Sequence, residues 1–262
     1  MRQWAWLLLL LLLFLMPVVL LVVQSFSGRW VYPELWPGAW SGLAWGKTFL
    51  HAAWWGPLVS SFGFSLATWG LASVLCFPAA AALARSPKRL DLLESLLLAP
   101  AIVPAMTTAL GNHLWMTWLG WTDSVVSLVP ILTFYTYPYL LRSLTAGYRL
   151  LGSDLSRAAL NLGATRLSVF WKIEFPLLVP AWVAGGSIVL LGAFSDYFLV
   201  SLFGGGVVPA FTTYLVPVLG SSDRTWGSVL TLMFLVGPLL LFGVLDLSIK
   251  KWMSCRGIGS LG

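Results

Sequence analysis

Six long apolar runs divide the chain, and the segments between them hold most of its charged residues. A helix needs about 20 predominantly apolar residues to cross the hydrocarbon core of a bilayer, and in lipid each helix must satisfy its own backbone groups. The pattern therefore predicts an all-α membrane protein. We expect six transmembrane helices, over about residues 4–23, 58–83, 92–111, 125–141, 178–203 and 226–247.

Composition agrees with this pattern. Hydrophobic residues make up 59% of the chain and charged residues only 9%, against about 25% charged in a typical soluble domain. No segment between the apolar runs approaches the roughly 50 residues of a small soluble domain. We therefore expect a single transmembrane domain over residues 1–262.

The first apolar run is too long for a signal-peptide core and no small-x-small cleavage site follows it, so we expect it to stay attached.

The distribution of Lys and Arg predicts the orientation. With the N-terminus in the cytoplasm, twelve basic residues fall on the cytoplasmic side and three outside, as the positive-inside rule requires. Both termini are then cytoplasmic, and the net charge of +6 needs no nucleic-acid partner. The inner group is Arg2, Arg85, Lys88, Arg89, Arg142, Arg149, Arg157, Arg166, Lys172, Lys250, Lys251 and Arg256, and the outer group is Arg29, Lys47 and Arg224.

The largest predicted cytoplasmic segment covers about residues 142–177. Ser153 can cap a short helix that has Asp154 in its first turn, where an acid suits the positive end of the helix dipole. Gly163 can supply the left-handed or close-packed position that ends this helix, and Thr165 can cap a second helix. Pro176 is expected to stop the second helix before the fifth span. These features alone support two interpretations equally: a surface that binds a partner protein, and a hairpin that only connects two spans.

Ala158, Ala159, Gly163, Ile173 and Pro176 stand at a fixed spacing in this segment that resembles a known motif. Binding-protein-dependent ABC importer permeases carry a cytoplasmic loop of the form E-A-A-x3-G-x9-I-x-L-P, about 100 residues from the C-terminus. This sequence departs from it at two positions, with Arg157 in place of Glu and Phe175 in place of Leu. The positions that match at every spacing are Ala158, Ala159, Gly163, Ile173 and Pro176.

The resemblance extends over about residues 58–250. Residues 60–85 are similar to the family's second helix, with its Pro-Ala ending and a closing Ala-Leu-Ala-Arg. The stretch "LLLAPAIVPAM" is similar to the proline-broken segment that follows, and "YPYLLRSLTAGYRLLGSDLSRAA" resembles the approach to the loop motif. The loop motif and the similarity of the flanking segments together favour the interpretation that this segment binds a partner protein.

The resemblance implies a permease subunit with the fold of type I ABC importers, in a prokaryotic cytoplasmic (inner) membrane. It implies a second permease subunit, identical or related, nucleotide-binding ATPase subunits, and an extracytoplasmic solute-binding protein. ATP and Mg would be used by the ATPase, with no cofactor bound by this chain and no enzymatic activity of its own. The residues it implies for the ATPase-coupling loop are Asp154, Arg157, Ala158, Ala159, Leu162 and Gly163, together with the motif positions Ile173 and Pro176.

The solute pathway offers one deep acid as a candidate, Asp196 in the fifth predicted span. Ionised groups in a membrane usually face a bundle interior or a wet cavity. One hypothesis is that Asp196 lines the pathway with Ser195 and, from the third span, Thr107, Thr108 and Asn112, mildly favouring a cationic or hydrogen-bond-rich cargo. The other is that Asp196 only bonds to a hydroxyl or backbone group of a neighbouring helix.

Other functional classes have weaker support. The stretch "GLAWGKT" has three residues between its glycines where a phosphate-binding loop needs four, so ATP binding by this chain is not expected. His51 and His113 are isolated, and no metal site is expected. A membrane enzyme would need clustered polar catalytic groups within the spans, which the sequence lacks. The alternative is an ATP-independent secondary transporter or channel, although no internal repeat supports it.

Overall fold

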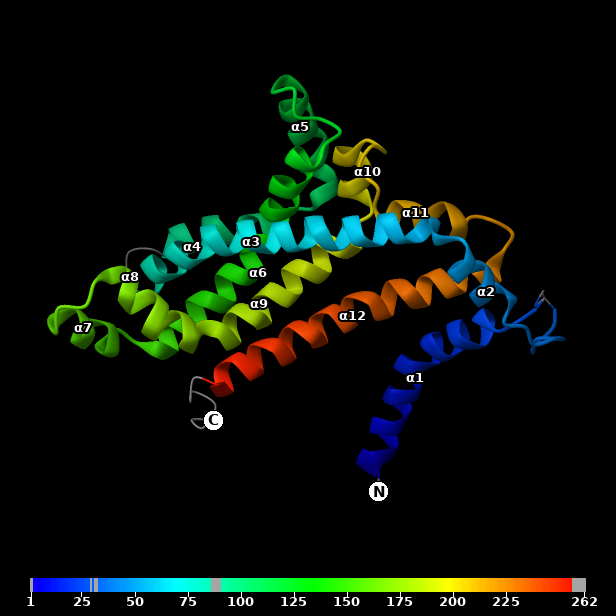
Figure 1. Ribbon diagram of the computed structural model, residues 1–262, viewed down its shortest axis with the longest axis horizontal. Helices are drawn as coiled ribbons and strands as arrows, with labels where there is room; N and C mark the ends of the chain where they lie inside the picture. Colours follow the sequence, from blue (N-terminus) through cyan, green and yellow to red (C-terminus); the bar gives the residue numbers. More distant parts are fainter. Residues whose placement is uncertain (1, 29, 31–32, 86–90, 256–262) are drawn as a thin grey trace. The chain divides into compact units, whose positions relative to one another are not determined.

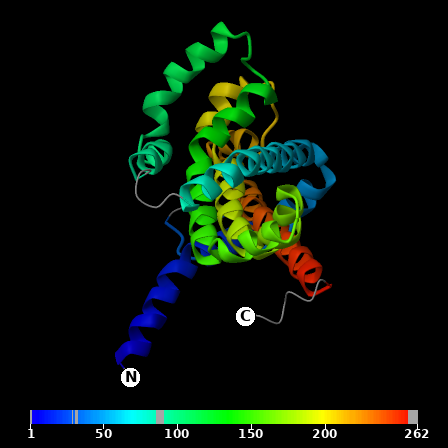
Figure 2. The same ribbon diagram turned by 90° about the vertical axis from the view of Figure 1, so that its left-hand side faces the viewer.

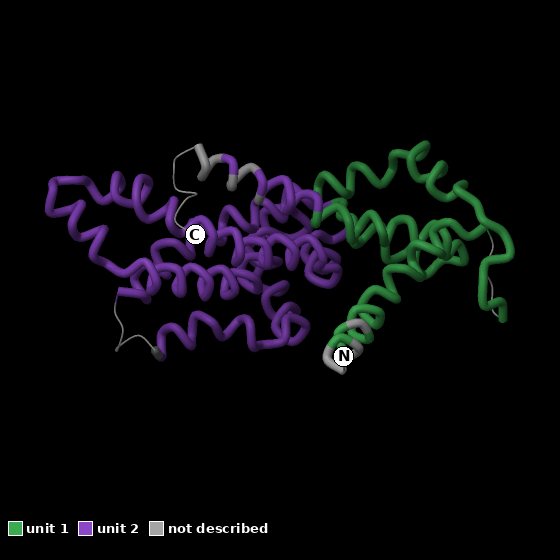
Figure 3. The backbone as a smooth tube through the Cα atoms, turned by 90° about the horizontal axis from the view of Figure 1, so that it is seen from below, with its two compact units in different colours: residues 1–60, 209–239 green, residues 61–208, 240–262 purple. Residues whose placement is uncertain are grey.

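The computed structural model describes the chain except for residues 1, 29, 31–32, 86–90 and 256–262. The chain forms two compact units, which we describe separately (Figure 3). Unit 1 contains residues 1–60 and 209–239, and unit 2 contains residues 61–208 and 240–262. The expectation of one transmembrane domain over the whole chain stays a prediction.

Unit 1 consists of helices and an aromatic loop. The indole Nε1 of Trp45 donates a hydrogen bond to Ser25 Oγ at 3.3 Å, and its ring stacks on both Phe26 and Phe49. These contacts hold the short helix over Leu43–Leu50 to the end of the first helix. The helices are α1 (Arg2–Ser25), α2 (Leu43–Leu50), η1 (Ala52–Trp54), the start of α3 (Trp55–Arg85), α11 (Phe211–Leu219) and the first part of α12 (Arg224–Cys255).

Unit 2 contains the predicted cytoplasmic segment and most of the long helices (Figure 1). It is helical throughout the part that the structure describes, apart from short connections. Its elements are the remainder of α3 and α12 with α4 (Asp91–Leu98), η2 (Ala99–Ala101), α5 (Ala105–Trp118), α6 (Val125–Leu151), α7 (Asp154–Asn161), α8 (Arg166–Val169), η3 (Phe170–Glu174), α9 (Phe175–Ser195) and α10 (Phe198–Gly204).

Helices α6 and α9 form the main packing contact of unit 2 and lie side by side in two views (Figures 1 and 2). Small residues allow the close approach: a Cβ on Gly147 would lie 2.9 Å from the Ala181 side chain, and one on Gly185 would lie 2.9 Å from the Leu140 backbone. Ser143 Oγ donates to the Ala181 carbonyl across this contact at 2.7 Å. Small residues and interhelical hydrogen bonds are typical of helix packing in membranes.

The structure does not confirm the number of spans that the sequence pattern predicts. Among the described residues, three helices are long and apolar enough to cross a membrane, over Ala52–Arg85, Arg166–Ser195 and Arg224–Leu245. A fourth is added if Leu92–Ala101 and Ala105–Trp118 together form one broken span. The described apolar part of α1, Leu9–Ser25, is shorter. The number of six spans stays a prediction, as does the orientation, and Arg29, Lys88, Arg89 and Arg256 lie outside the described residues.

Two predicted spans are interrupted. The pattern predicts one helix over 92–111, but α4 with η2 and α5 meet at a bend of 92° (Figure 2). Pro104, with ψ 125°, precedes α5, and proline disfavours a helical conformation in the residue before it. The pattern also predicts one helix over 178–203, but α9 ends at Ser195 and α10 begins after an extended Asp196.

Candidate functional site

The first short helix of the predicted cytoplasmic segment forms where the sequence places it. Gly152, with φ 67°, ends α6, and α7 begins at Asp154, an exposed acid in its first turn. Ser153 lies at the N-cap position, although its side chain accepts no hydrogen bond from the helix. Ala158 is exposed and Ala159 half-buried, so one side of α7 presents small side chains at its surface.

The loop after α7 turns at a glycine with a left-handed backbone. Gly163 has φ +88°, a conformation that L side chains rarely adopt, and its N–H donates to the Leu160 carbonyl at 3.0 Å. No described atom lies within 4 Å of the place where a Cβ would stand. The neighbouring Leu162 side chain is 89% exposed. The predicted left-handed backbone at Gly163 is confirmed, and the surface beside it is open.

The second helix of the segment, α8, continues through η3 into α9, and together they are long enough to cross a membrane. Thr165 caps α8 as predicted, because its hydroxyl accepts the Ser168 N–H at 3.3 Å. Pro176 does not stop the helix, and this expectation is wrong: residues 166–195 form one continuous helix. Pro176 lies in the first turn of α9 directly after η3, a π turn that contains Ile173. Proline has no N–H to donate, and the π turn directly before it is where the continuous helix accommodates this missing donor.

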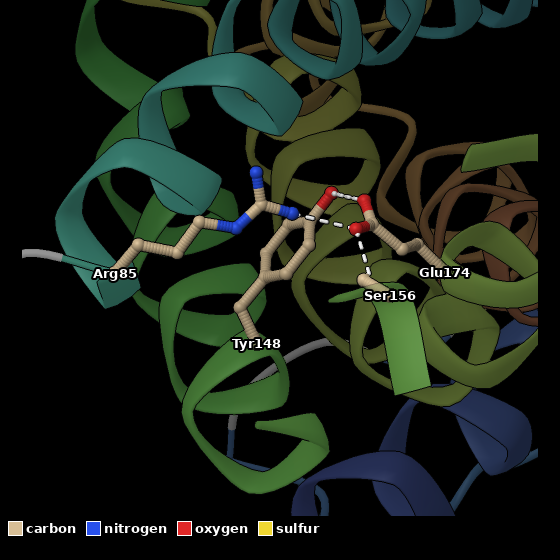
Figure 4. Close-up of polar contacts among 4 residues, drawn as sticks. All are labelled: Arg85, Tyr148, Ser156 and Glu174. Atoms are coloured by element: carbon tan, nitrogen blue, oxygen red, sulfur yellow. Dashed lines mark hydrogen bonds and ion pairs between the residues drawn. The ribbon is translucent and has the colours of Figure 1, made fainter. Parts of the chain in front are cut away.

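A buried carboxylate connects this segment to the rest of unit 2. Glu174, at the end of η3, is 6% exposed. Its Oε1 accepts hydrogen bonds from Arg85 Nη2 at 2.5 Å and from Ser156 Oγ at 2.8 Å, and its Oε2 accepts one from Tyr148 Oη at 3.4 Å (Figure 4). Burying a carboxylate is costly unless it is paired and hydrogen-bonded, and here it is both. Helices α3, α6 and α7 thus meet on one residue of η3.

The Tyr148 phenol is neutral at physiological pH, and this arrangement strengthens that preference. Burial raises the pKa of its phenol above the ordinary value, and the negative charge of Glu174 raises that pKa further, against the opposing effect of Arg85. The phenol therefore remains a hydrogen-bond donor to the carboxylate at physiological pH. The Arg85 guanidinium also lies 5.9 Å from the centre of the Tyr148 ring, within reach of a cation–π contact.

Sequence reasoning did not include this four-residue network among the site residues. Glu174 lies between the motif positions Ile173 and Pro176, and it is an acid at the edge of an apolar segment. An ionisable residue in that setting marks a candidate functional position, so a signal was present. Its partners on three other helices could be found only from the fold.

The predicted pathway residues fall into two places. Thr108 and Asn112 on α5 meet Tyr135 of α6: Thr108 Oγ1 lies 2.5 Å from the Tyr135 hydroxyl, and Asn112 Nδ2 donates to it at 3.1 Å. Thr107 is exposed on the same helix. Asp196, with Ser195 before it, lies at the break between α9 and α10.

Asp196 does not lie inside a helix, contrary to the expectation for the fifth span. Its Oδ1 accepts the Leu199 N–H of α10 at 2.7 Å. An Asp carboxylate at this position satisfies a backbone donor of the first turn, as a helix cap does. Its part in a solute pathway stays a prediction. Among the described residues, no group of three or more His, Cys, Asp and Glu side chains could hold a metal ion.

The comparisons define the class of protein to which these features correspond. Residues 3–253 match the family described as binding-protein-dependent transport system inner membrane component, and the chain belongs to that family. It is therefore a component of a transport system in the inner membrane, with several apolar helices. The family consists of transport permeases rather than enzymes.

Three kinds of relative show the range of the family. The chain is 29% identical over 158 residues to the molybdenum transport system permease protein ModB of Mycobacterium tuberculosis, covering 54% of this chain and 60% of the relative. It is 25% identical to the phosphate transport system permease protein PstA of Mycobacterium leprae, covering 59% and 57%. It is 29% identical to the spermidine/putrescine transport system permease protein PotB of Escherichia coli, covering 50% and 54%. The matched region spans little more than half of each relative's length.

A solved structure shares the fold. A chain of a bacterial ABC transporter involved in the import of the acidic polysaccharide alginate superposes with a TM-score of 0.74, covering 94% of each chain at 16% identity. At this identity the likeness concerns the fold alone. The expected type I ABC importer permease-like architecture is thereby confirmed at the level of the fold.

Proposed function

We propose that this chain is the transmembrane permease subunit of an ATP-driven ABC importer, which forms the solute pathway and couples to a separate ATPase subunit through residues 142–177. The observation that carries the coupling role is the Glu174 network, supported by family membership. Ala158 on α7 and Leu162 directly after it are exposed, while the only buried residue of α7, Ser156, bonds directly to Glu174.

This geometry gives a route for mechanical coupling. An ATPase subunit bound at α7 would move that helix when its ATP-binding sites close. The displacement would reach Glu174 through Ser156, and then α3 through Arg85 and α6 through Tyr148. Because Glu174 precedes α9 in one continuous helix, α9 would move with it. The pathway would then alternate between inward-facing and outward-facing states.

The proposal includes the partners of the assembly. Two permease subunits, this chain with a copy or a relative, would enclose the pathway, with a solute-binding protein outside and ATPase subunits in the cytoplasm. ATP and Mg would be bound by the ATPase, and both termini of this chain would be cytoplasmic. The pathway residues would include the cluster of Thr108, Asn112 and Tyr135, with Ser195, Asp196 and Thr107 as further candidates.

A purification experiment tests the proposal. The tagged chain is extracted from its native membranes in mild detergent, and the copurifying proteins are identified. We expect an ATPase with a nucleotide-binding domain, and ATP hydrolysis that a solute-binding protein stimulates after reconstitution. Transport that runs on an ion gradient without any ATPase would contradict the proposal and favour a secondary transporter. The three relatives are named as permeases for molybdenum, phosphate and spermidine/putrescine. Molybdate, phosphate and spermidine are therefore the first cargoes to test.

A further inference from the structure

Two recesses lined by arginine lie beside α7. The larger has a volume of about 310 Å³, and its charged lining residues are Arg85, Arg157, Arg166 and Glu174. The smaller, of about 220 Å³, shares Arg85 and Arg157 with the first and adds Arg149. Four arginines and one carboxylate therefore surround this end of the segment.

Two of these four arginines have no acidic partner among the described residues. Glu174 is paired with Arg85, and Arg149 is paired with Glu94 at 2.5 Å. Within the part of the chain that the structure describes, Arg157 and Arg166 form no ion pair, and both are exposed. The two recesses thus present two unneutralised guanidinium groups, each able to hold a carboxylate by two parallel hydrogen bonds.

The surroundings of the recess are those of a protein interface. Leu155 and Leu160 on α7 are 57% and 40% exposed, and Leu162 directly after α7 is 89% exposed. Exposed apolar side chains mark sites of contact with other proteins or with a membrane. Arginine is also enriched in protein interfaces.

We propose that the recess at Arg157 and Arg166 accepts an Asp or Glu side chain of the ATPase subunit. This inference rests on the proposed function, because it concerns how the ATPase binds α7. The motif position that is Glu in the resembling permeases is Arg157 here, so the charge on the permease side of the contact is reversed. A volume of about 310 Å³ has room for one or two side chains, which fits an inserted acidic residue.

Charge reversal tests this contact in the assembled complex. The tagged chain and its copurifying ATPase are immobilised, and the ATPase retained is measured at increasing NaCl concentration. The variants are Arg157→Glu, Arg166→Glu, and the control Lys172→Glu, an exposed cation of the same segment that lines neither recess. We expect Arg157→Glu to weaken retention by roughly tenfold or more, and wild-type retention to fall with salt. Lys172→Glu should stay near wild type.

A compensating change identifies the acid. Acidic residues on the ATPase surface are changed singly to Arg in the presence of Arg157→Glu, and one of these should restore retention. The Arg157→Gln variant separates loss of the contact from loss of folding, because both its retention of the ATPase and the melting temperature of the purified chain are measured. Since Arg157 is exposed, we expect the variant chain to melt at the wild-type temperature.

Several results would overturn the inference. Equal retention of the ATPase by Arg157→Glu and wild type, or no rescue by any acid-to-Arg change, would do so while leaving the proposed function intact. A defect of Arg157→Glu that appears only in nanodiscs containing phosphatidylglycerol would assign the recess to anionic lipid, and competition by inorganic phosphate at matched ionic strength would assign it to a free anion. If no ATPase copurifies with wild type at any salt concentration, the proposed function itself fails and takes this inference with it.

Discussion

Replacing Glu174 is the most direct perturbation of the network that joins α7 to the membrane helices. Glu174→Ala removes three interactions at once. The ion pair to the half-exposed Arg85 contributes about 1 kcal/mol after solvent screening. The buried Ser156 hydroxyl loses its acceptor, at a cost of about 1–3 kcal/mol, and the longer bond from Tyr148 adds about 0.5–1.5 kcal/mol.

The sum predicts that Glu174→Ala lowers the free energy of unfolding by about 2.5–5.5 kcal/mol. Glu174→Gln keeps the shape and one acceptor oxygen, so we expect a smaller loss of about 1–2 kcal/mol. The assay is denaturant titration of the purified chain in mixed micelles, with helicity as the signal. Retention of the ATPase is measured separately on the same variants. We expect Glu174→Gln to remain folded while retention of the ATPase falls, because α7 loses its firm attachment.

The chain provides a matched control for this experiment. Glu94 pairs with Arg149 at the same distance of 2.5 Å, but the Glu94 side chain is 23% exposed against 8% for Glu174. A surface ion pair contributes about 0–1 kcal/mol, so Glu94→Ala should cost no more than that. If Glu94→Ala and Glu174→Ala lower the free energy of unfolding equally, burial does not account for the contribution of the Glu174 network.

Three further predictions concern the loop, the pathway and the topology. Gly163→Val should cost about 1–2 kcal/mol at φ +88° and reduce transport while membrane insertion persists, as measured by uptake and by the amount of chain in the membrane. Asp196→Asn should lower uptake if the carboxylate charge acts in the pathway, and the assembled complex should persist. A cysteine at Ser168 should be shielded from an impermeant thiol reagent outside intact cells, and a cysteine at Ser222 should be labelled.

Each of these has a contrary outcome. Normal uptake with normal ATPase binding in Gly163→Val would remove Gly163 from the coupling surface, and Gly163→Asn, which tolerates the left-handed region, serves as its control. Unchanged uptake in Asp196→Asn, or loss of the complex, would assign Asp196 to capping α10 alone. Labelling of the Ser168 cysteine from outside would reverse the predicted orientation.

The features predicted correctly from the sequence depend on local interactions. Gly163 turns the chain because of its own backbone freedom, and Thr165 caps α8 through a residue three positions away. The start of α7 at Asp154 likewise needs only neighbouring residues. Such features are encoded over a few positions, which is why a single sequence contains enough information to place them.

The features that were missed depend on tertiary contacts or on local geometry that periodicity does not report. The partners of Glu174 are 89, 26 and 18 residues away in the chain, so no local pattern connects them. Pro176 was expected to end a helix, but the π turn before it places the proline in a first turn. Asp196 interrupts the fifth span, although hydropathy treats residues 178–203 as continuous.

Site-specific photo-crosslinking tests the central claim that α7 and the loop after it form the docking surface for an ATPase. A photoreactive amino acid is placed at Leu162, which is 89% exposed beside Gly163, and for comparison at Leu35, which is 87% exposed in the predicted outer loop. We expect the chain with the photoreactive residue at Leu162, and not the one at Leu35, to crosslink in native membranes to a protein with a nucleotide-binding domain. The absence of any such crosslink at Leu162, or equal crosslinking at Leu35, would contradict it.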